Sequence, residues 1–318
     1  LGWWSTDEPL TIGAWCWPFE VSPIPFCFVL AAIAIAAFIL WERRRTEHGR
    51  STMIPLDLFR IPSFRNGNIV AMIISLGELG MLFVLPLWLQ NVLRYDALQT
   101  GLLLLALAIG SFLASGMAGG LSRLLTPTGM LRLGVALELV AVLALAITLR
   151  PDSGPLQLTV LLFVYGLGLG LASAQVTNVV LADVPVDESG RASGTQSTSR
   201  QIGSALGIAI LGTVLFGSLG GYLEDGLADL EEGQRSKIVE AVTDSAGAAI
   251  PALEDAPATA EIGRIAADAL TSAASTAAYV AAAFLAVALV ASLFLRSRRA
   301  ESATEPTEVV AVEGEQGP

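Results

Sequence analysis

The hydrophobic pattern of the chain consists of long apolar runs separated by short blocks that hold most of the charged residues. A membrane-spanning helix needs about 20 mostly apolar residues to cross the hydrocarbon layer. The run from Gly101 to Leu121 has this length and contains no charged residue. Such windows predict seven spans, at residues 21–41, 68–92, 100–123, 129–149, 156–181, 201–220 and 274–295. The pattern therefore predicts an all-α, polytopic membrane protein.

The one long polar connection, residues 223–273, separates the last two spans and carries eleven acids and three bases. The segments LADLEEGQRSKIVEAV and IGRIAADALTSA place apolar residues at helical spacing, with Pro251 and Pro257 between them. We expect two short amphipathic helices here. The alternative is a disordered acidic loop, because the connection is rich in Ala and Gly and has no aromatic residue. Residues 297–318, rich in Glu, Thr and Pro, are expected to be a disordered tail.

The distribution of Lys and Arg predicts the orientation of the spans. Short connections on one side hold thirteen basic residues, against Arg94 and Arg150 on the other side. The positive-inside rule makes the first side cytoplasmic, so the C-terminus lies inside and residues 1–20 form an extracytoplasmic hairpin. Seventeen of the eighteen basic residues are Arg and Ala is very frequent, which suggests a GC-rich bacterial genome. We therefore expect a multi-pass protein of the bacterial inner membrane, in contact with the lipid bilayer.

Composition removes several classes of function. The chain is 53% apolar and 15% charged, with a net charge of -11, which argues against binding to nucleic acid. Two cysteines and one histidine are too few for a disulfide framework, a zinc site or a His-dependent triad. A phosphate-binding GxxxxGK[ST] loop is not in the sequence. We expect no metal, no cofactor and no catalytic residue.

Two carboxyl groups, those of Glu78 and Glu138, fall near the middle of predicted spans. A charged carboxylate at that depth is costly, so a functional group that takes up and releases a proton is one explanation. Ser75 lies three residues before Glu78 on the same helix face, and Gly77 and Gly80 leave room beside it. The alternative is a protonated, structural glutamate, which fits Glu138 better because no polar neighbour shares its face.

Other polar and small residues cluster within the spans. Candidates for a substrate cavity are Ser75, Gln90, Asn91, Tyr165, Gln175 and Asn178. Such groups orient a ligand in an apolar cavity, although interhelical hydrogen bonding explains them equally well. Candidates for close helix packing are Gly116, Gly120, Gly166, Gly170, Gly203 and Gly207. Small residues at this spacing mark either a static contact or a seam between moving bundles.

Four segments carry a resemblance to a known family. They are residues 41–68, with the phrase PLDLFRIPSF, then residues 85–110, residues 181–212 and the acidic connection. As a set they resemble the C-terminal half of fourteen-helix drug:proton antiporters of the major facilitator superfamily, the EmrB/QacA type. The resemblance spans nearly all of residues 1–296 and implies a C-terminal part of that fold.

The resemblance implies a division of the chain and a mechanism. Residues 21–41 would be an extra central helix, 42–67 the cytoplasmic connector and 68–296 the C-terminal six-helix bundle, with the N-terminal half of the transporter missing. The spans at 68–92 and 156–181 would line the cavity, which favours Glu78, Gln175 and Asn178 over Glu138. The implied activity is secondary transport, in which hydrophobic compounds leave in exchange for protons by alternating access. The two midplane acids make a cationic substrate plausible.

Two alternatives belong to other classes of protein. One is a membrane scaffold or sensor that binds a partner through the acidic connection. The other is a membrane-embedded, lipid-modifying enzyme, which would need His, Asp or Glu side chains gathered near one interface. The acids gather only in residues 223–273, so the enzyme is the weaker alternative.

Overall fold

A computed structural model describes residues 11–12, 15–16, 23–48 and 56–295. The chain divides into two compact units, Leu1–Leu56 and Asp57–Pro318, which are treated separately. In the first unit, strands β1 (Thr11–Ile12) and β2 (Trp15–Cys16) pair antiparallel and helix α1 covers Pro23–Glu47. Most of the expected hairpin at 1–20 and the whole tail at 297–318 lie outside the described residues.

Seven helices in the described part of the chain are long and apolar enough to cross a membrane, which confirms the predicted all-α membrane fold. Besides α1 they are α2 (Pro62–Asn91), α3 (Ala97–Leu121), α4 (Pro127–Thr148), α5 (Pro155–Val180), α6 (Ser189–Gly226) and α9 (Ala260–Leu293). Shorter elements are the 3-10 helices η1 (Leu56–Arg60) and η2 (Val186–Glu188), α7 (Glu232–Asp244) and α8 (Ile250–Asp255).

Local sequence signals set several of these helix starts. Pro occupies the first turn of α2, α4 and α5, where its missing N–H removes no helical hydrogen bond. Asp96 and Gln99 form a reciprocal capping box at the start of α3, and the Thr126 side chain accepts from the Gly129 N–H at the start of α4. These caps satisfy N–H groups that have no partner within the helix.

The last two long helices extend well beyond their predicted spans. Helix α6 begins at Ser189 instead of residue 201, and α9 begins at Ala260 instead of 274. A hydropathy window detects only the part of a helix that matches the hydrocarbon layer, so charged first turns escape it. The first amphipathic run forms α7, whereas the second is the N-terminal part of α9 and not a separate helix.

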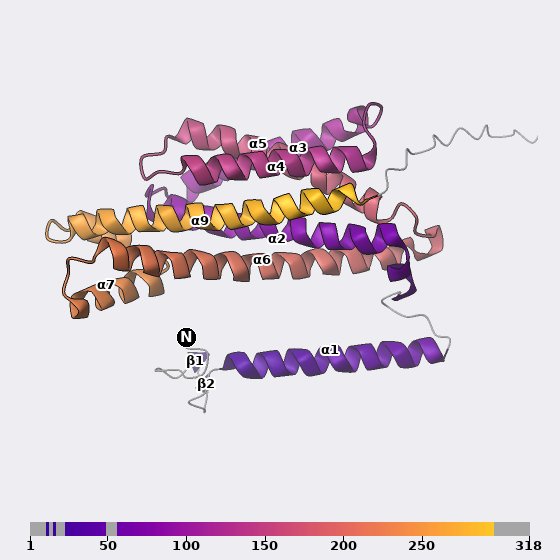
Figure 1. The fold of residues 1–318 in the computed structure, drawn as a ribbon, viewed down its shortest axis with the longest axis horizontal. Coiled ribbons are helices and arrows are strands. Elements are labelled where there is room, and N and C mark those ends of the chain that lie inside the picture. The colour runs from indigo at the N-terminus through magenta and orange to yellow at the C-terminus, as the bar shows by residue number, and fades with distance from the viewer. Residues whose placement is uncertain (1–10, 13–14, 17–22, 49–55, 296–318) are drawn as a thin grey trace, which may run out of the picture. The chain divides into compact units, whose positions relative to one another are not determined.

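The six long helices described in the second unit pack in an exchanged pattern. Helix α3 packs along α5, and α6 packs along α2 (Figure 1). Helices α4 and α9 contact each other; α4 also packs on α5, and α9 also packs on α2 and α6. If α2–α3–α4 and α5–α6–α9 are taken as two triplets, each middle helix packs against the first helix of the other triplet. The seam between α2 and α6 therefore joins residues far apart in sequence.

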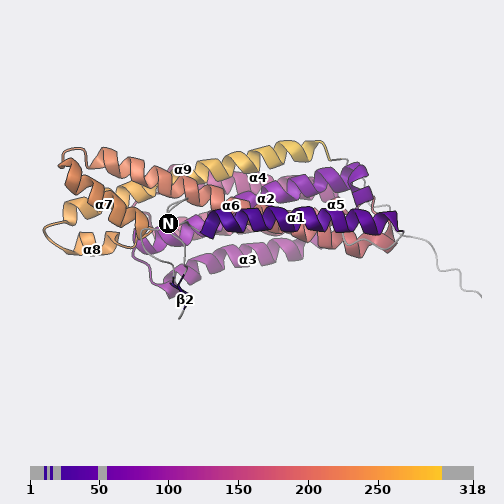
Figure 2. The same cartoon turned by 90° about the horizontal axis from the view of Figure 1, so that it is seen from below.

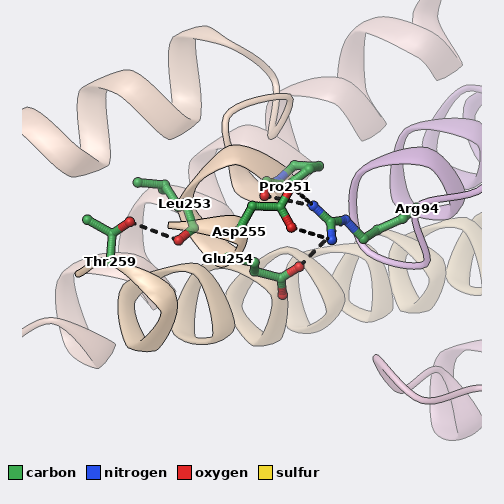
Figure 3. Close-up of polar contacts among 6 residues, drawn as sticks. All are labelled: Arg94, Pro251, Leu253, Glu254, Asp255 and Thr259. Carbon is green, nitrogen blue, oxygen red and sulfur yellow. Dashed lines mark hydrogen bonds and ion pairs between the residues drawn. The ribbon is translucent and has the colours of Figure 1, made fainter. Parts of the chain in front are cut away.

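Helices α7 and α8 lie at one end of this bundle, where α7 contacts α6 and α8 contacts α9 (Figures 1 and 2). Arg94, in the α2–α3 connection, holds α8 there (Figure 3). Its Nη1 and Nη2 atoms donate to the two carboxylate oxygens of Asp255 at 2.8 and 2.7 Å, and Nη2 also donates to the Pro251 carbonyl at 2.8 Å. The Nε atom lies 4.0 Å from Glu254. Arg94 makes these contacts from a left-handed backbone conformation, with φ of 57°.

Replacement of Arg94 by Asn is expected to loosen α8. Asn tolerates a left-handed backbone but removes the guanidinium. The hydrogen bond from Arg94 lowers the pKa of Asp255. A lowered carboxyl pKa contributes stability that is present above the ordinary Asp pKa and is lost as pH falls through the lowered value. Hydrogen exchange of the α8 amides, corrected for intrinsic rates, should therefore be faster in the variant at neutral pH, and the two proteins should converge in acid.

The control for this prediction is Arg60→Asn, which breaks an exposed ion pair with Asp57 in η1. It should leave the exchange of α8 unchanged. Equal exchange of α8 in wild type and Arg94→Asn at neutral pH would show that the Arg94 contacts do not hold this helix.

Candidate functional site

Glu78 is buried at the seam between α2 and α6. Its side chain is 2% exposed, and Ser75, on the same face of α2, is also buried. Two glycines let the neighbouring helices approach: a Cβ at Gly77 would lie 3.2 Å from the Leu285 side chain of α9, and one at Gly80 would lie 2.8 Å from the Gly207 carbonyl oxygen of α6. The spacing of small and polar residues in α2 thus places a carboxyl group at a tight helix contact.

Arg200 of α6 is the charged partner of Glu78. Its Nη2 lies 3.8 Å from Glu78 Oε2, and its Nε donates to Ser75 Oγ at 3.2 Å. The Arg200 side chain is 36% exposed, so the ion pair joins a buried acid to a base that reaches the surface of the unit. The sequence does not predict this pair, because Arg200 directly precedes the predicted span at 201–220 and so falls in a connection.

Glu138 and Tyr165 lie behind the ion pair. Both are fully buried, and the Tyr165 hydroxyl donates to the Glu78 backbone carbonyl at 3.3 Å. A Cβ at Gly168 of α5 would lie 2.8 Å from Glu138 Cγ, so a glycine makes the space that the Glu138 side chain occupies. Two acids, one base and one phenol thus share the interior around α2, α4, α5 and α6.

Several oxygen atoms of these acids have no hydrogen-bond donor among the described residues. They are Oε1 of Glu78 and both carboxyl oxygens of Glu138. A buried carboxylate that lacks donors is destabilised relative to its protonated form. The arrangement is therefore suited to holding and releasing protons, and Arg200 is the group that stabilises the charged form of Glu78.

An open groove borders Arg200 on the other side. It has a volume of about 580 Å³ and is lined by Leu79 of α2 and by Ser197, Arg200, Gln201, Ser204, Ala205 and Ile208 of α6. Pockets that take drug-sized ligands have volumes of about 300 to 1,000 Å³. A second cavity, of about 10 Å³, lies between Glu78, Ser75, Ser173 and Arg200. It offers room for about one water molecule. Arg200 is the residue that lines both the groove and this small cavity.

The other polar candidates lie elsewhere. Gln175 is buried and accepts a hydrogen bond from Asn178 Nδ2 at 3.2 Å, so these two amides pair along one helix. Asn91 donates to the Ala246 carbonyl at 3.0 Å and so binds the turn after α7. Gln90 is exposed near the same end of α2. The groove beside Arg200 is lined by none of these side chains.

The glycine candidates divide into two groups. A Cβ at Gly166 or Gly170 would overlap the backbone of α3, and one at Gly203 or Gly207 would overlap the backbone of α2. Gly116 and Gly120 differ, because a Cβ there would meet no described atom within 4 Å. They lie on the exposed side of α3, away from its buried face of Leu107, Gly110 and Ala114. The described chain therefore gives these two glycines no packing partner, and their role in helix packing stays a prediction.

Comparison with known proteins places the chain in a family. The model of the Major Facilitator Superfamily matches residues 11–208. The chain is 31% identical over 218 residues to the tetracenomycin C resistance and export protein of Streptomyces glaucescens, with 68% of this chain and 39% of that protein covered. It is 31% identical over 218 residues to the multidrug resistance protein Stp of Mycobacterium tuberculosis, with 68% of this chain and 40% of that protein covered.

A probable actinorhodin transporter of Streptomyces coelicolor is 29% identical over 224 residues, with 68% of this chain and 38% of that protein covered. The chain thus spans about two fifths of the length of these relatives. The family model covers more than half of the chain, and the relatives are named as drug or antibiotic exporters, which confirms the resemblance seen in the sequence. The chain belongs to the major facilitator superfamily.

Proposed function

We propose that this chain is part of a transporter that exports hydrophobic small molecules in exchange for protons, by alternating access between two helix bundles. The export and resistance proteins among its relatives support the substrate class. The observation that carries the proton coupling is the ion pair between buried Glu78 and Arg200. A transporter coupled to protons needs a group whose charge changes during the cycle, and a buried acid with one movable counter-ion meets that need.

The proposal includes the orientation and the division of the chain. We place the end with α7 and α8 outside the cell and the C-terminus in the cytoplasm, because basic residues concentrate in the connections at the other end. Residues 68–296 supply one bundle, and the second bundle belongs to the N-terminal half of the full-length transporter. The transporter lies in the bacterial inner membrane and is not an enzyme.

The experiment that tests the proposal uses the full-length protein in inside-out vesicles with an imposed pH gradient. Addition of tetracenomycin C or puromycin, compounds named for relatives, should dissipate the gradient in wild type. Glu78→Gln should show only background dissipation, because an amide side chain does not take up a proton in this pH range.

The matched control is Glu232→Gln, which replaces an exposed acid in α7 by the same amide. It should behave as wild type. Full dissipation in Glu78→Gln would show that the coupling carboxyl lies elsewhere, and no dissipation in wild type with any hydrophobic compound would contradict proton-coupled export.

A further inference from the structure

The groove beside Arg200 combines an apolar floor with hydrogen-bonding groups. Leu79, Ala205 and Ile208 provide the apolar part, and Ser197, Gln201 and Ser204 provide hydroxyl and amide groups. Arg200 supplies the one charged side chain of the groove lining. This lining suits a ligand with a large apolar surface and a few polar atoms.

Arg200 is at once part of the groove wall and the counter-ion of Glu78. Its guanidinium carries five N–H donors, of which one binds Ser75 and another faces Glu78. While Glu78 is charged, its negative charge balances the positive charge of Arg200. A ligand that binds in the groove then covers a guanidinium that still has its counter-ion. When Glu78 is protonated, a ligand in the groove would cover an unpaired guanidinium, which is unfavourable because the ligand excludes the water that solvates it.

We propose that this groove is a binding site for an uncharged, mainly apolar molecule with hydrogen-bonding groups, and that Arg200 transmits protonation of Glu78 to this ligand by becoming an unpaired charge. The inference rests on the proposed transport function. Arg200 is a positioning and specificity residue in it, and Glu78 carries the proton. Ligand and proton then exclude each other, which is the relation that exchange of one for the other requires.

The same reasoning fixes the effect of ligand charge. An anion would bind the guanidinium that protonation sets free, so anion and proton would bind together and not in exchange. A cation meets the positive charge of Arg200 on the groove wall at any pH, and Glu78 does not line the groove. The expectation of a cationic substrate, drawn from the two acids alone, is therefore replaced by that of an uncharged one.

The groups that face Glu78 from each packed helix are consistent with this assignment. Arg200 faces it from α6, and Tyr165 of α5 binds its backbone carbonyl. Glu138 of α4 is the other buried acid near the site, and neither of its carboxyl oxygens has a hydrogen-bond donor among the described residues. On α9, the atoms nearest this turn of α2 belong to Ala281 and Leu285, which carry no charge. Arg200 is therefore the base whose charge the protonation of Glu78 leaves unpaired.

The test measures binding to the purified full-length protein in detergent without any gradient. The probes are the uncharged dye phenylnaphthylamine and its anionic analogue anilinonaphthalene sulfonate, which share one ring system. From about pH 9 to about pH 5, the range in which a buried carboxyl titrates, the dissociation constant of the uncharged dye should rise, by at most about tenfold per pH unit for one competing proton. That of the anionic dye should fall.

Variants identify the groups involved. Arg200→Gln should remove both pH dependences, and Arg200→Lys should keep them because the positive charge remains. Glu78→Gln should bind the uncharged dye weakly and the anionic dye tightly at every pH. Ala205→Phe should fill the groove and abolish binding of both dyes, whereas Ile202→Phe, at an exposed position of α6 outside the lining, should not.

The inference is overturned if the affinity for the uncharged dye is independent of pH, if Arg200→Gln or Arg200→Lys behaves otherwise, or if Ala205→Phe leaves binding intact. Failure of the proposed function is distinguishable from this failure. Proton-coupled export with pH-independent binding removes the groove assignment alone. If the dyes bind as expected but the protein moves no protons, the exchange mechanism is contradicted and the binding site is retained.

Discussion

Replacement of Arg200 by Ala is expected to destabilise the folded protein by about 1 to 2 kcal/mol, because it leaves Glu78 buried without its positive partner, although Arg200 itself is 36% exposed. Removal of one member of a buried ion pair is more harmful than removal of both, since the remaining charge has lost its compensation. The double variant Arg200→Ala with Glu78→Gln should therefore regain most of the lost free energy of unfolding. The double variant should not regain all of it, because the Ser75 hydroxyl still lacks the hydrogen bond that it accepts from Arg200 Nε in the wild type.

The measurement is a double-mutant cycle of unfolding in mixed detergent micelles, with wild type, each single variant and the double variant. Arg123→Ala is the matched control, because it removes a basic residue from the α3–α4 connection, for which the structure shows no acidic partner within the described chain. Additive losses in the cycle would show that Glu78 and Arg200 do not depend on each other, and both the coupling site and the groove assignment would lose their basis.

The membrane-spanning helices could be predicted from the sequence because the bilayer imposes length and apolarity on each span independently of its neighbours. The midplane position of Glu78 was predicted in the same way. The partner of Glu78 was not, since Arg200 is 125 residues away from Ser75 in sequence and meets α2 only through the packing of α6. The predicted span also begins only at residue 201, so the sequence places Arg200 in the connection before it, whereas α6 already begins at Ser189.

The spacing of small residues also predicts only part of the helix packing. Spacing of four residues marks a helix face that is free of side chains, but it does not say whether another helix covers that face. Gly203 and Gly207 lie against α2, whereas Gly116 and Gly120 have no described neighbour. For Tyr165, burial and its bond to the Glu78 carbonyl depend on how α5 crosses α2, which no local signal encodes.

Gly207→Val is expected to have the largest effect on folding among single substitutions at the α2–α6 seam. A Cβ at Gly207 would overlap the Leu76 carbonyl oxygen, and the Gly207 carbonyl itself lies 2.8 Å from the position of a Cβ at Gly80. Backbone atoms on both sides cannot rotate away, so α6 must move from α2 at a cost of about 3 kcal/mol or more. The movement would also separate Arg200 from Glu78, so the pH dependence of ligand binding should be lost in any protein that still folds.

Gly116→Val is the matched control, because the same side chain meets no described atom within 4 Å on the exposed side of α3. Valine is a better helix former than glycine by a few tenths of a kcal/mol, so this variant should match wild type or slightly exceed it. The yield of monodisperse protein and unfolding in mixed micelles measure both. If Gly207→Val were as stable as Gly116→Val, α2 and α6 would not be in backbone contact. The ion pair between Arg200 and Glu78 would then not depend on this contact.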